Sequence, residues 1–230
     1  MKTIIDHQKI RRRARLSNLM SIGGLITLLA SVLVPLFVQR LANLSFLLMV
    51  VGLGVSMVGI YYANRWVRQP RPEDKLDKSL KSLNDSCHLY HYPSLPCDHV
   101  LLSPSAVVIL ETVGLGGAFK YHNGKWKESM TIGRALRYIV EEHLGNPIRT
   151  ARETEGYLKK QFEKLELLEV PIKSVVVFTN PAVQLDIDSA SIPVVKVEKL
   201  RKHIQTDTLR LEADVYTKLD DYFTNLTSKS

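Results

Sequence analysis

Acidic side chains are almost absent from the first 68 residues of this 230-residue chain, which hold nine Lys or Arg but only one acid, Asp6. Residues 69–230 hold 22 basic and 22 acidic side chains, so the net charge of +8 lies entirely in the N-terminal part. A neutral C-terminal part lacks the global attraction that supplies most non-specific DNA affinity. The charge distribution therefore indicates a membrane surface near the N-terminus, and any nucleic-acid role requires a local basic patch.

Charged side chains are also missing from two long apolar runs, 19–38 and 45–63. Each run approaches the roughly 20 residues that cross about 30 Å of hydrocarbon as a helix. Neither run keeps the polar face of a half-buried soluble helix. We therefore predict a transmembrane helical hairpin over 19–66, which serves as an anchor because no charged residue inside either apolar run marks an ion pathway.

The orientation of the hairpin follows from its flanking charges, because basic residues cluster at both outer ends and only Arg40 lies between the two runs. The positive-inside rule then predicts a multi-pass protein of the cell (inner) membrane, with both termini cytoplasmic and the lipid bilayer as a partner. A cleaved signal peptide is disfavoured because no small-residue cleavage site follows the first run. Small residues recur at three- to four-residue spacing and predict close helix packing: Gly23, Thr27, Ala30 and Ser31 in the first run, Gly52, Ser56 and Gly59 in the second.

Cysteine is scarce as well, with only Cys87 and Cys97 in the part predicted to be cytosolic, where we expect no disulfide. Together with His88, His91 and His99 they crowd into one short stretch. However, the stretch has no C-x-x-C or H-x₃-H pair, and a strand there would point His88 and His91 to opposite faces, so a zinc site is disfavoured. No G-x-S-x-G, Walker or kinase motif set occurs, which leaves serine-hydrolase, nucleotide-driven and kinase activities without support.

Hydrophobic periodicity divides the rest of the chain into an amphipathic helix that ends near Asn84, then short strands, then alternating helices and strands. The expected strands are 88–92, 99–102, 107–113, 118–122, 174–179 and 194–197, and the later helices are 133–144, 149–168, 198–204 and 208–225. This order predicts an α/β or α+β domain with a central mixed sheet. The predicted organisation is a basic cytoplasmic N-terminus (1–18), the hairpin (19–66), a linker (67–72), the domain (73–204) and a C-terminal helical tail (205–230).

Several motifs of the predicted domain share one pattern. Glu73 opens the first helix, Asp98 precedes the strand run that continues to Leu102, and Glu111 ends the run Val108-Ile109-Leu110-Glu111. The later matching segments are Gly117, Gly124-Lys125-Trp126, Asn146-Pro147-Ile148 and 175–179. Over about residues 73–204 this pattern resembles the nuclease-related domain (NERD) family.

The resemblance implies a restriction-endonuclease-like core, in which an Asp and a Glu-x-Lys hold a divalent metal and activate water. Asp98 and Glu111 then occupy the two carboxylate positions for Mg²⁺ or Mn²⁺, and Glu73 matches the acidic residue of the first helix. Two carboxylates suit such a metal, and a lysine helps to orient the attacking water. Here Val113 stands at the lysine position, and Thr150 stands where the family has glutamine. These two departures favour lost or altered catalysis.

Two interpretations of the domain follow. The first is a membrane-anchored, cytoplasm-facing nuclease-related domain with a degenerate site and a binding or scaffolding role, for which nucleic-acid processing is the candidate process. The second is an active metal-dependent DNA or RNA phosphodiesterase that uses Asp98 and Glu111, with Lys120 or Lys125 replacing the missing lysine. Without the resemblance, Asp98 reads as a strand-entry residue and Glu111 as a carboxylate paired with a nearby lysine.

The most basic stretch of the domain is the candidate contact for a phosphate backbone. It comprises Lys120, Lys125, Lys127, Arg134 and Arg137, with only Glu128 among them. A solvated hairpin face is the alternative that the charge pattern favours. The C-terminal segment 206–230 alternates charged and apolar residues, so we expect it to pack on the domain or on a partner.

Overall fold

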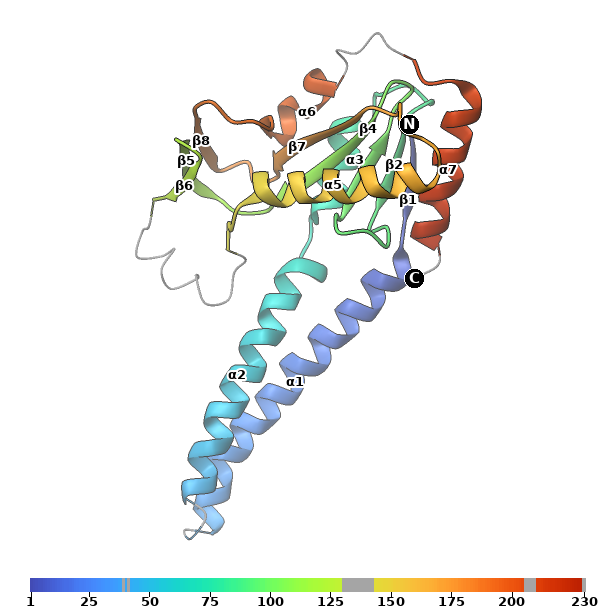
Figure 1. Ribbon diagram of the computed structural model, residues 1–230. Coiled ribbons are helices and arrows are strands. Elements are labelled where there is room, and N and C mark those ends of the chain that lie inside the picture. The colour runs from blue at the N-terminus through green and yellow to red at the C-terminus, as the bar shows by residue number, and fades with distance from the viewer. Residues whose placement is uncertain (39, 41, 130–142, 205–209, 229–230) are drawn as a thin grey trace. The chain divides into compact units, whose positions relative to one another are not determined.

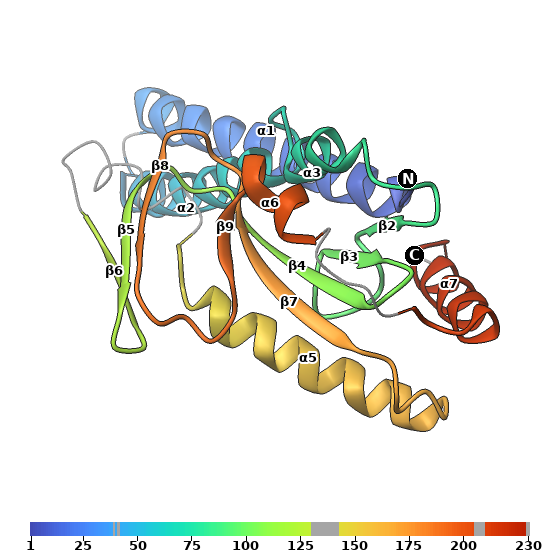
Figure 2. The same ribbon diagram turned by 90° about the horizontal axis from the view of Figure 1, so that it is seen from above.

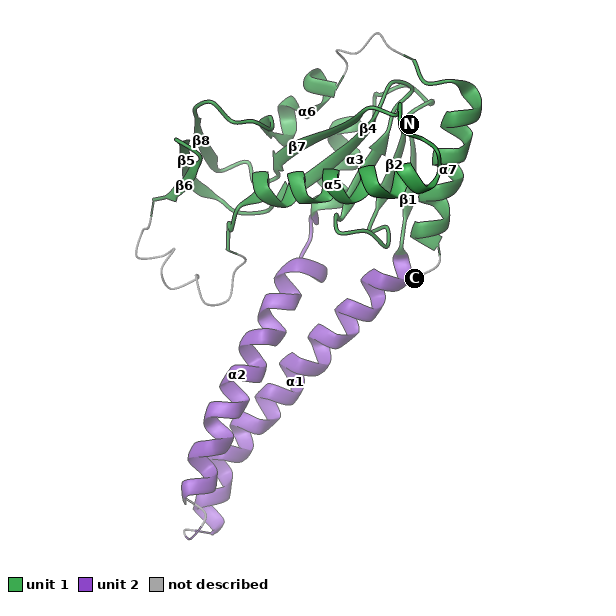
Figure 3. Cartoon of the chain, viewed as in Figure 1, with its two compact units in different colours: residues 1–6, 72–129, 143–230 green, residues 7–71, 130–142 purple. Residues whose placement is uncertain are grey.

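The computed structural model describes residues 1–38, 40, 42–129, 143–204 and 210–228. It divides into two compact units, which are coloured separately in Figure 3. The first unit comprises residues 1–6, 72–129 and 143–230, and the second comprises residues 7–71 and 130–142. The predicted helix 133–144 lies almost entirely outside the described residues.

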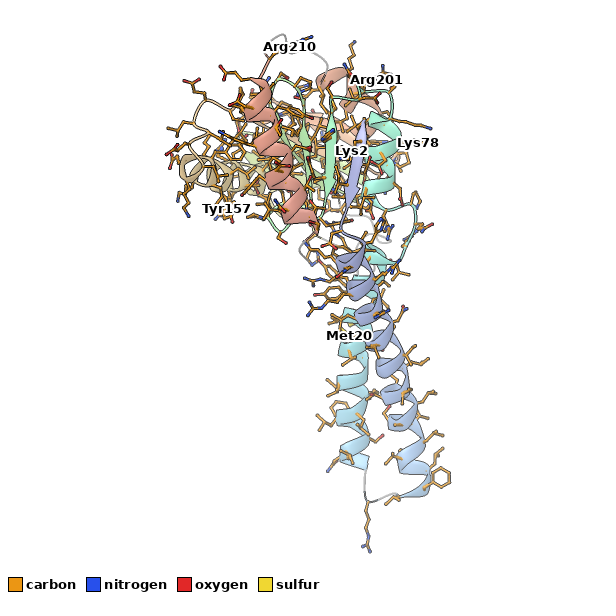
Figure 4. The ribbon with its side chains drawn as sticks, turned by 90° about the vertical axis from the view of Figure 1, so that its right-hand side faces the viewer. Lys2, Met20, Lys78, Tyr157, Arg201 and Arg210 are labelled. Carbon is orange, nitrogen blue, oxygen red and sulfur yellow. The ribbon has the colours of Figure 1, made fainter. Side chains whose placement is uncertain are left out.

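The second unit contains two helices that are long and apolar enough to cross a membrane, α1 (His7–Phe37) and α2 (Ala42–Trp66). Their large apolar side chains are exposed, including Leu19 at 71% and Leu36 at 73%. Figure 4 shows side chains projecting outward along both helices. The core helix of a soluble protein buries such side chains, so this exposure distinguishes the pair from core helices. α1 begins twelve residues before the predicted run at 19, because the basic segment before that run is also helical.

Small residues bring α1 and α2 together. Buried residues recur every seven positions on both helices: Ile10, Ser17, Gly24 and Ser31 on α1, and Gly52, Gly59 and Trp66 on α2. Ser17 Oγ donates to the Gly59 carbonyl at 3.0 Å, and a Cβ added at Gly24 would stand 2.3 Å from Ser56 Oγ. The predicted close packing is confirmed, except that Gly24 rather than Gly23 makes the contact. A seven-residue repeat is typical of a left-handed helix pair.

The first unit is built on a six-stranded mixed sheet (Figure 1). Its strands are β1 (Lys2–Ile5), β2 (His88–His91), β3 (His99–Leu102), β4 (Val107–Val113), β7 (Ile172–Phe178) and β9 (Val194–Lys196), in the spatial order β1-β2-β3-β4-β7-β9. β3 runs antiparallel to β2 and β4, whereas the β1–β2, β4–β7 and β7–β9 pairs are parallel. The predicted mixed sheet is confirmed.

The N-terminal strand β1 was not expected, since residues 1–18 had been assigned to a basic N-terminal segment. Thr3 and Ile4 pair with Leu89 and Tyr90 of β2, and Ile4 packs into the core beside α7 (Ala213–Ser228). A four-residue strand is too short for a clear period-two pattern, and its partner lies 86 residues away along the chain, so no local signal announces the pairing. Residues on both sides of the α1–α2 hairpin therefore belong to one sheet.

Helices cover both faces of the sheet (Figure 2). α3 (Pro72–Leu80) and α6 (Val197–Ile204) pack on one face through Leu76, Leu80 and Leu200, against Leu89 and Val108 among others. α5 (Pro147–Lys164) and α7 cover the other face, which includes Tyr90, Val100 and Ile109. Neighbouring strand residues thus point to opposite layers, as the pleat requires. The C-terminal segment expected as a tail contains α7, which is part of the domain. Of the two expectations for this segment, packing on the domain or on a partner, the structure shows packing on the domain.

A second sheet of three strands has the order β6-β5-β8 and comprises β5 (Gly117–His122), β6 (Lys125–Glu128) and β8 (Val183–Ile187). β5 and β6 form the hairpin expected from Asn123-Gly124. Both turn residues have positive φ, 51° and 76°, as the two-residue turn of a twisted hairpin requires. β8 was not predicted, because its five residues lack a strong apolar pattern.

Candidate metal and nucleic-acid site

Asp98 directly precedes β3, and Glu111 belongs to the neighbouring strand β4 of the main sheet. The β3–β4 pairing ends with Val100 opposite Ile109, and Asp98 and Glu111 each lie two residues beyond that pair. Both side chains are half-buried. The sheet therefore gives the two predicted carboxylates positions from which both could approach one cation.

Glu73 is connected to this end of the sheet through Tyr92. The Tyr92 hydroxyl donates to Glu73 Oε2 at 2.6 Å, and the Tyr92 N–H donates to the Asp98 carbonyl at 2.6 Å. Tyr92 has a left-handed φ of 61°, which is an uncommon conformation for an aromatic residue. The bond to Glu73 and the packing of the Tyr92 ring against His99, at 5.2 Å between centroids, stabilise that conformation. Glu73 is fully buried, so its carboxylate supports the hairpin rather than facing solvent.

A pair of buried histidines extends the same polar network, and sequence reasoning missed it. His91 and His99 face each other across β2 and β3 with 2.7 Å between their Nδ1 atoms. His91 Nε2 lies 3.2 Å from Asp77 Oδ1 of α3, which also accepts from Thr3 Oγ1 of β1 at 3.0 Å. The network therefore joins β1, β2, β3 and α3. The sequence signal for this pair is the presence of one histidine on each side of a short hairpin. That signal identifies a contact only when the register of the two strands is known.

The position expected to carry lysine lies in the apolar core. Val113 is 6% exposed and belongs to a cluster with Ile148, Val176 and Phe178. Its carbonyl accepts from the Thr179 N–H at 2.9 Å, which fixes the end of β4. Because Val113 and Glu111 are two residues apart on one strand, their side chains leave the same face of the sheet. On that face apolar packing replaces the ammonium group that the family pattern requires.

The alternative lysines belong to the second sheet. Lys120 Nζ pairs with Asp186 Oδ2 of β8 at 3.2 Å. Lys120 and His122 together hold the pKa of the Asp186 carboxyl below its ordinary value. Lys125 is exposed near the turn of the β5–β6 hairpin. The ion pair of Lys120 thus lies within the second sheet.

The basic face of the β5–β6 hairpin is partly neutralised. Lys120 lies directly opposite Lys127, and His122 lies opposite Lys125. His122 Nε2 also lies 3.3 Å from Asp186 Oδ1, and His122 Nδ1 lies 3.6 Å from Asp188 Oδ2. Lys125 and Lys127 remain exposed as candidate phosphate contacts. Arg134 and Arg137 lie outside the described residues.

Two of the predicted site residues, Asp98 and Glu111, carry side chains that could hold a divalent metal. No group of three or more His, Cys, Asp or Glu side chains converges in the described part of the chain. Asp98 and Glu111 supply two oxygen ligands of the kind that Mg²⁺ accepts, but the lysine partner is replaced by buried Val113. The two carboxylates of the family pattern are therefore present, and its lysine is not.

The histidine and cysteine stretch does not gather at one point. His88 Nδ1 lies 2.5 Å from Asp220 Oδ1 of α7, whereas His91 contacts Asp77 of α3, so the expected opposite orientation of the two is confirmed. Cys87 and Cys97 belong to separate apolar clusters. At Asp220, burial opposes ionisation, but hydrogen bonds from Tyr90 and His88 outweigh it and lower the pKa of the carboxyl. Asp220 thus attaches α7 to β2.

Comparison with known families found a match to the domain. Residues 70–179 match the family model of the nuclease-related domain, a range that runs from the start of α3 to the end of β7. No curated protein and no solved structure matched the chain. The matched range includes Glu73, Asp98 and Glu111, and the mixed sheet with its flanking helices agrees with the restriction-endonuclease-like architecture that the family implies. Residues 70–179 of the chain therefore match the nuclease-related domain (NERD) family.

Proposed function

We propose that this protein is a membrane-anchored nuclease-related domain that faces the cytoplasm and binds its target without cleaving it. The observation that carries the proposal is the burial of Val113 among apolar side chains at the position of the family's lysine. With valine in place of that lysine, the attacking water lacks the residue that the family pattern uses to orient it beside the phosphate. The domain keeps the scaffold of a nuclease and acts in binding or scaffolding.

Pairing between β1 and β2 supports the proposed topology. β1 precedes the α1–α2 hairpin and β2 follows it, yet the two strands form one parallel pair. If the helices span the membrane, both flanks of the hairpin must therefore lie on one side. The basic residues at both flanks favour the cytoplasmic side of the cell (inner) membrane. Reporter fusions test this: a reporter active only in the cytoplasm should work at the C-terminus and fail when inserted between α1 and α2.

Nucleic acid is the proposed target, through Lys125 and Lys127 on the exposed hairpin face. The carboxylates of Asp186 and Asp188 reduce the local charge, so we expect binding to be weak and strongly dependent on salt. A Lys125→Gln/Lys127→Gln variant should lose most of this binding. Unchanged affinity in that variant would show that the hairpin face is not the contact.

An active phosphodiesterase is the second candidate, because Asp98 and Glu111 each lie two residues beyond the last pair of β3 and β4. Titration calorimetry of the full chain with Mg²⁺ and Mn²⁺ separates the two proposals. The binding proposal predicts no metal uptake that depends on both carboxylates. Uptake that Asp98→Ala and Glu111→Ala each remove would establish a metal site and favour the enzyme.

A further inference from the structure

Exposed arginines crowd the end of the hairpin at which α1 begins and α2 ends. We call the five of them the arginine collar: Arg11, Arg12, Arg13, Arg15 and Arg68. Residues 7–71 contain no Asp or Glu, so no carboxylate in this segment neutralises the collar. Like charges one helical turn apart, such as Arg11 and Arg15, repel each other. An anion from outside the hairpin would relieve that repulsion.

Three collar arginines share the side of α1 that faces away from α2. At 100° per residue, Arg11, Arg12 and Arg15 fall within an arc of about 100°. Ser17, which donates to Gly59 of α2, lies on the opposite side of the helix. The three guanidinium groups are therefore directed toward the surroundings of the hairpin. They occupy about 6 Å along the helix axis, which is close to the thickness of one headgroup layer.

The collar residues of α1 directly precede the uncharged part of that helix. Residues 16–37 of α1 carry no charge and extend for about 33 Å, enough to cross the hydrocarbon once. With that segment in the bilayer, Arg15 stands at the hydrocarbon boundary and the other collar residues of α1 stand in the headgroup layer. The depth of the collar thus follows from the length of the apolar segment.

Aromatic residues of α2 hold the fourth arginine of α1 at the same level. The Arg13 guanidinium lies 5.9 Å from the Tyr62 ring centroid and 6.0 Å from that of Trp66. Arg13 Nη1 also lies 3.5 Å from the Tyr62 hydroxyl. Tyrosine and tryptophan favour the boundary between headgroups and hydrocarbon. Arg13 of α1 and the two aromatic residues of α2 therefore lie at the same level along the hairpin.

We propose that the arginine collar binds the phosphate-bearing headgroups of anionic phospholipids in preference to zwitterionic ones. The inference rests on the proposed membrane anchoring. A zwitterionic headgroup brings its own cation next to the arginines, whereas an anionic headgroup neutralises them. Guanidinium groups suit phosphate because they present paired donors in a fixed fork.

Trp66 provides a reporter inside the collar, since the chain has only one other tryptophan, Trp126. The full chain carrying Trp126→Phe is reconstituted into vesicles that contain brominated phosphatidylglycerol or brominated phosphatidylcholine at equal mole fraction. The test variant adds Arg11→Gln, Arg12→Gln and Arg15→Gln. The matched control removes three exposed charges from the domain instead: Lys159→Gln, Lys160→Gln and Lys199→Gln.

We expect the brominated anionic lipid to quench Trp66 more strongly, and each arginine to contribute about fivefold to that preference. The test variant should lose the preference while phosphatidylcholine still quenches, and the control should keep it. Equal quenching by both lipids in the natural collar, or an unchanged preference in the test variant, would overturn the inference and leave the anchor standing. Absence of quenching by either lipid would overturn the proposed anchoring itself.

Discussion

Replacing Val113 by lysine restores the family pattern and tests whether its position still belongs to a polar site. Val113 is 6% exposed and packs among Ile148, Val176 and Phe178. A charge buried there without a compensating partner costs about 3–5 kcal/mol. For a protein of this size each kcal/mol lowers the melting temperature by about 2–4 °C, so we expect Val113→Lys to melt roughly 6–20 °C below the natural protein.

Val113→Met provides the matched control, because methionine has nearly the length of lysine but no charge. The added apolar length of methionine in this packed core should cost about 1–3 kcal/mol of unfolding free energy. Thermal unfolding in detergent, followed by near-ultraviolet circular dichroism, measures both variants. If Val113→Lys is as stable as Val113→Met, the side chain at 113 reaches water or a carboxylate, and the argument that apolar packing has replaced the site is refuted.

Three further predictions concern the hairpin, β1 and α7. Gly24→Leu should lengthen the spin-label distance between α1 and α2, because even a Cβ there would stand 2.3 Å from a serine oxygen, whereas Gly23→Leu meets open space and should not. Ile4→Ala should lower the free energy of unfolding by roughly 1–3 kcal/mol in denaturant titrations, since Ile4 packs into the core, while exposed Lys2→Ala changes little. Asp220→Asn should be less stable than the natural protein above about pH 4. That difference should disappear as the pH falls further, because a lowered carboxyl pKa stabilises the fold only while the group is ionised, and a constant difference would contradict the Asp220 contact.

Local patterns in the sequence predicted most of the elements. The turn at Asn123-Gly124 and the strands β3 and β4 follow from turn chemistry and from runs of apolar β-branched residues. Elements that depend on distant partners were missed: β1 pairs with a strand more than 80 residues away, and β8 is defined by its pairing with β5. The close approach of Gly24 rather than Gly23 likewise depends on the rotation of α1 against α2.

The candidate site shows the same division. Asp98 was predictable as a strand-entry residue and Glu111 as a strand residue, but their places beside the end of the β3–β4 pairing follow only from the register. The bond from Tyr92 to Glu73 and the His91–His99 pair require the β2–β3 hairpin and α3 to be in place. Sequence reasoning identifies residue types suited to chemistry, whereas the burial of the polar network depends on the assembled sheet.

The measurement that tests the central claim most directly is cleavage of plasmid and single-stranded DNA by the full chain in detergent with Mg²⁺ or Mn²⁺, beside Glu111→Ala. The full chain is required because β1 lies before the hairpin and forms part of the sheet. We predict no cleavage beyond the level that Glu111→Ala also shows. Cleavage that Glu111→Ala abolishes would contradict the account, because the site would then be catalytic without the family's lysine.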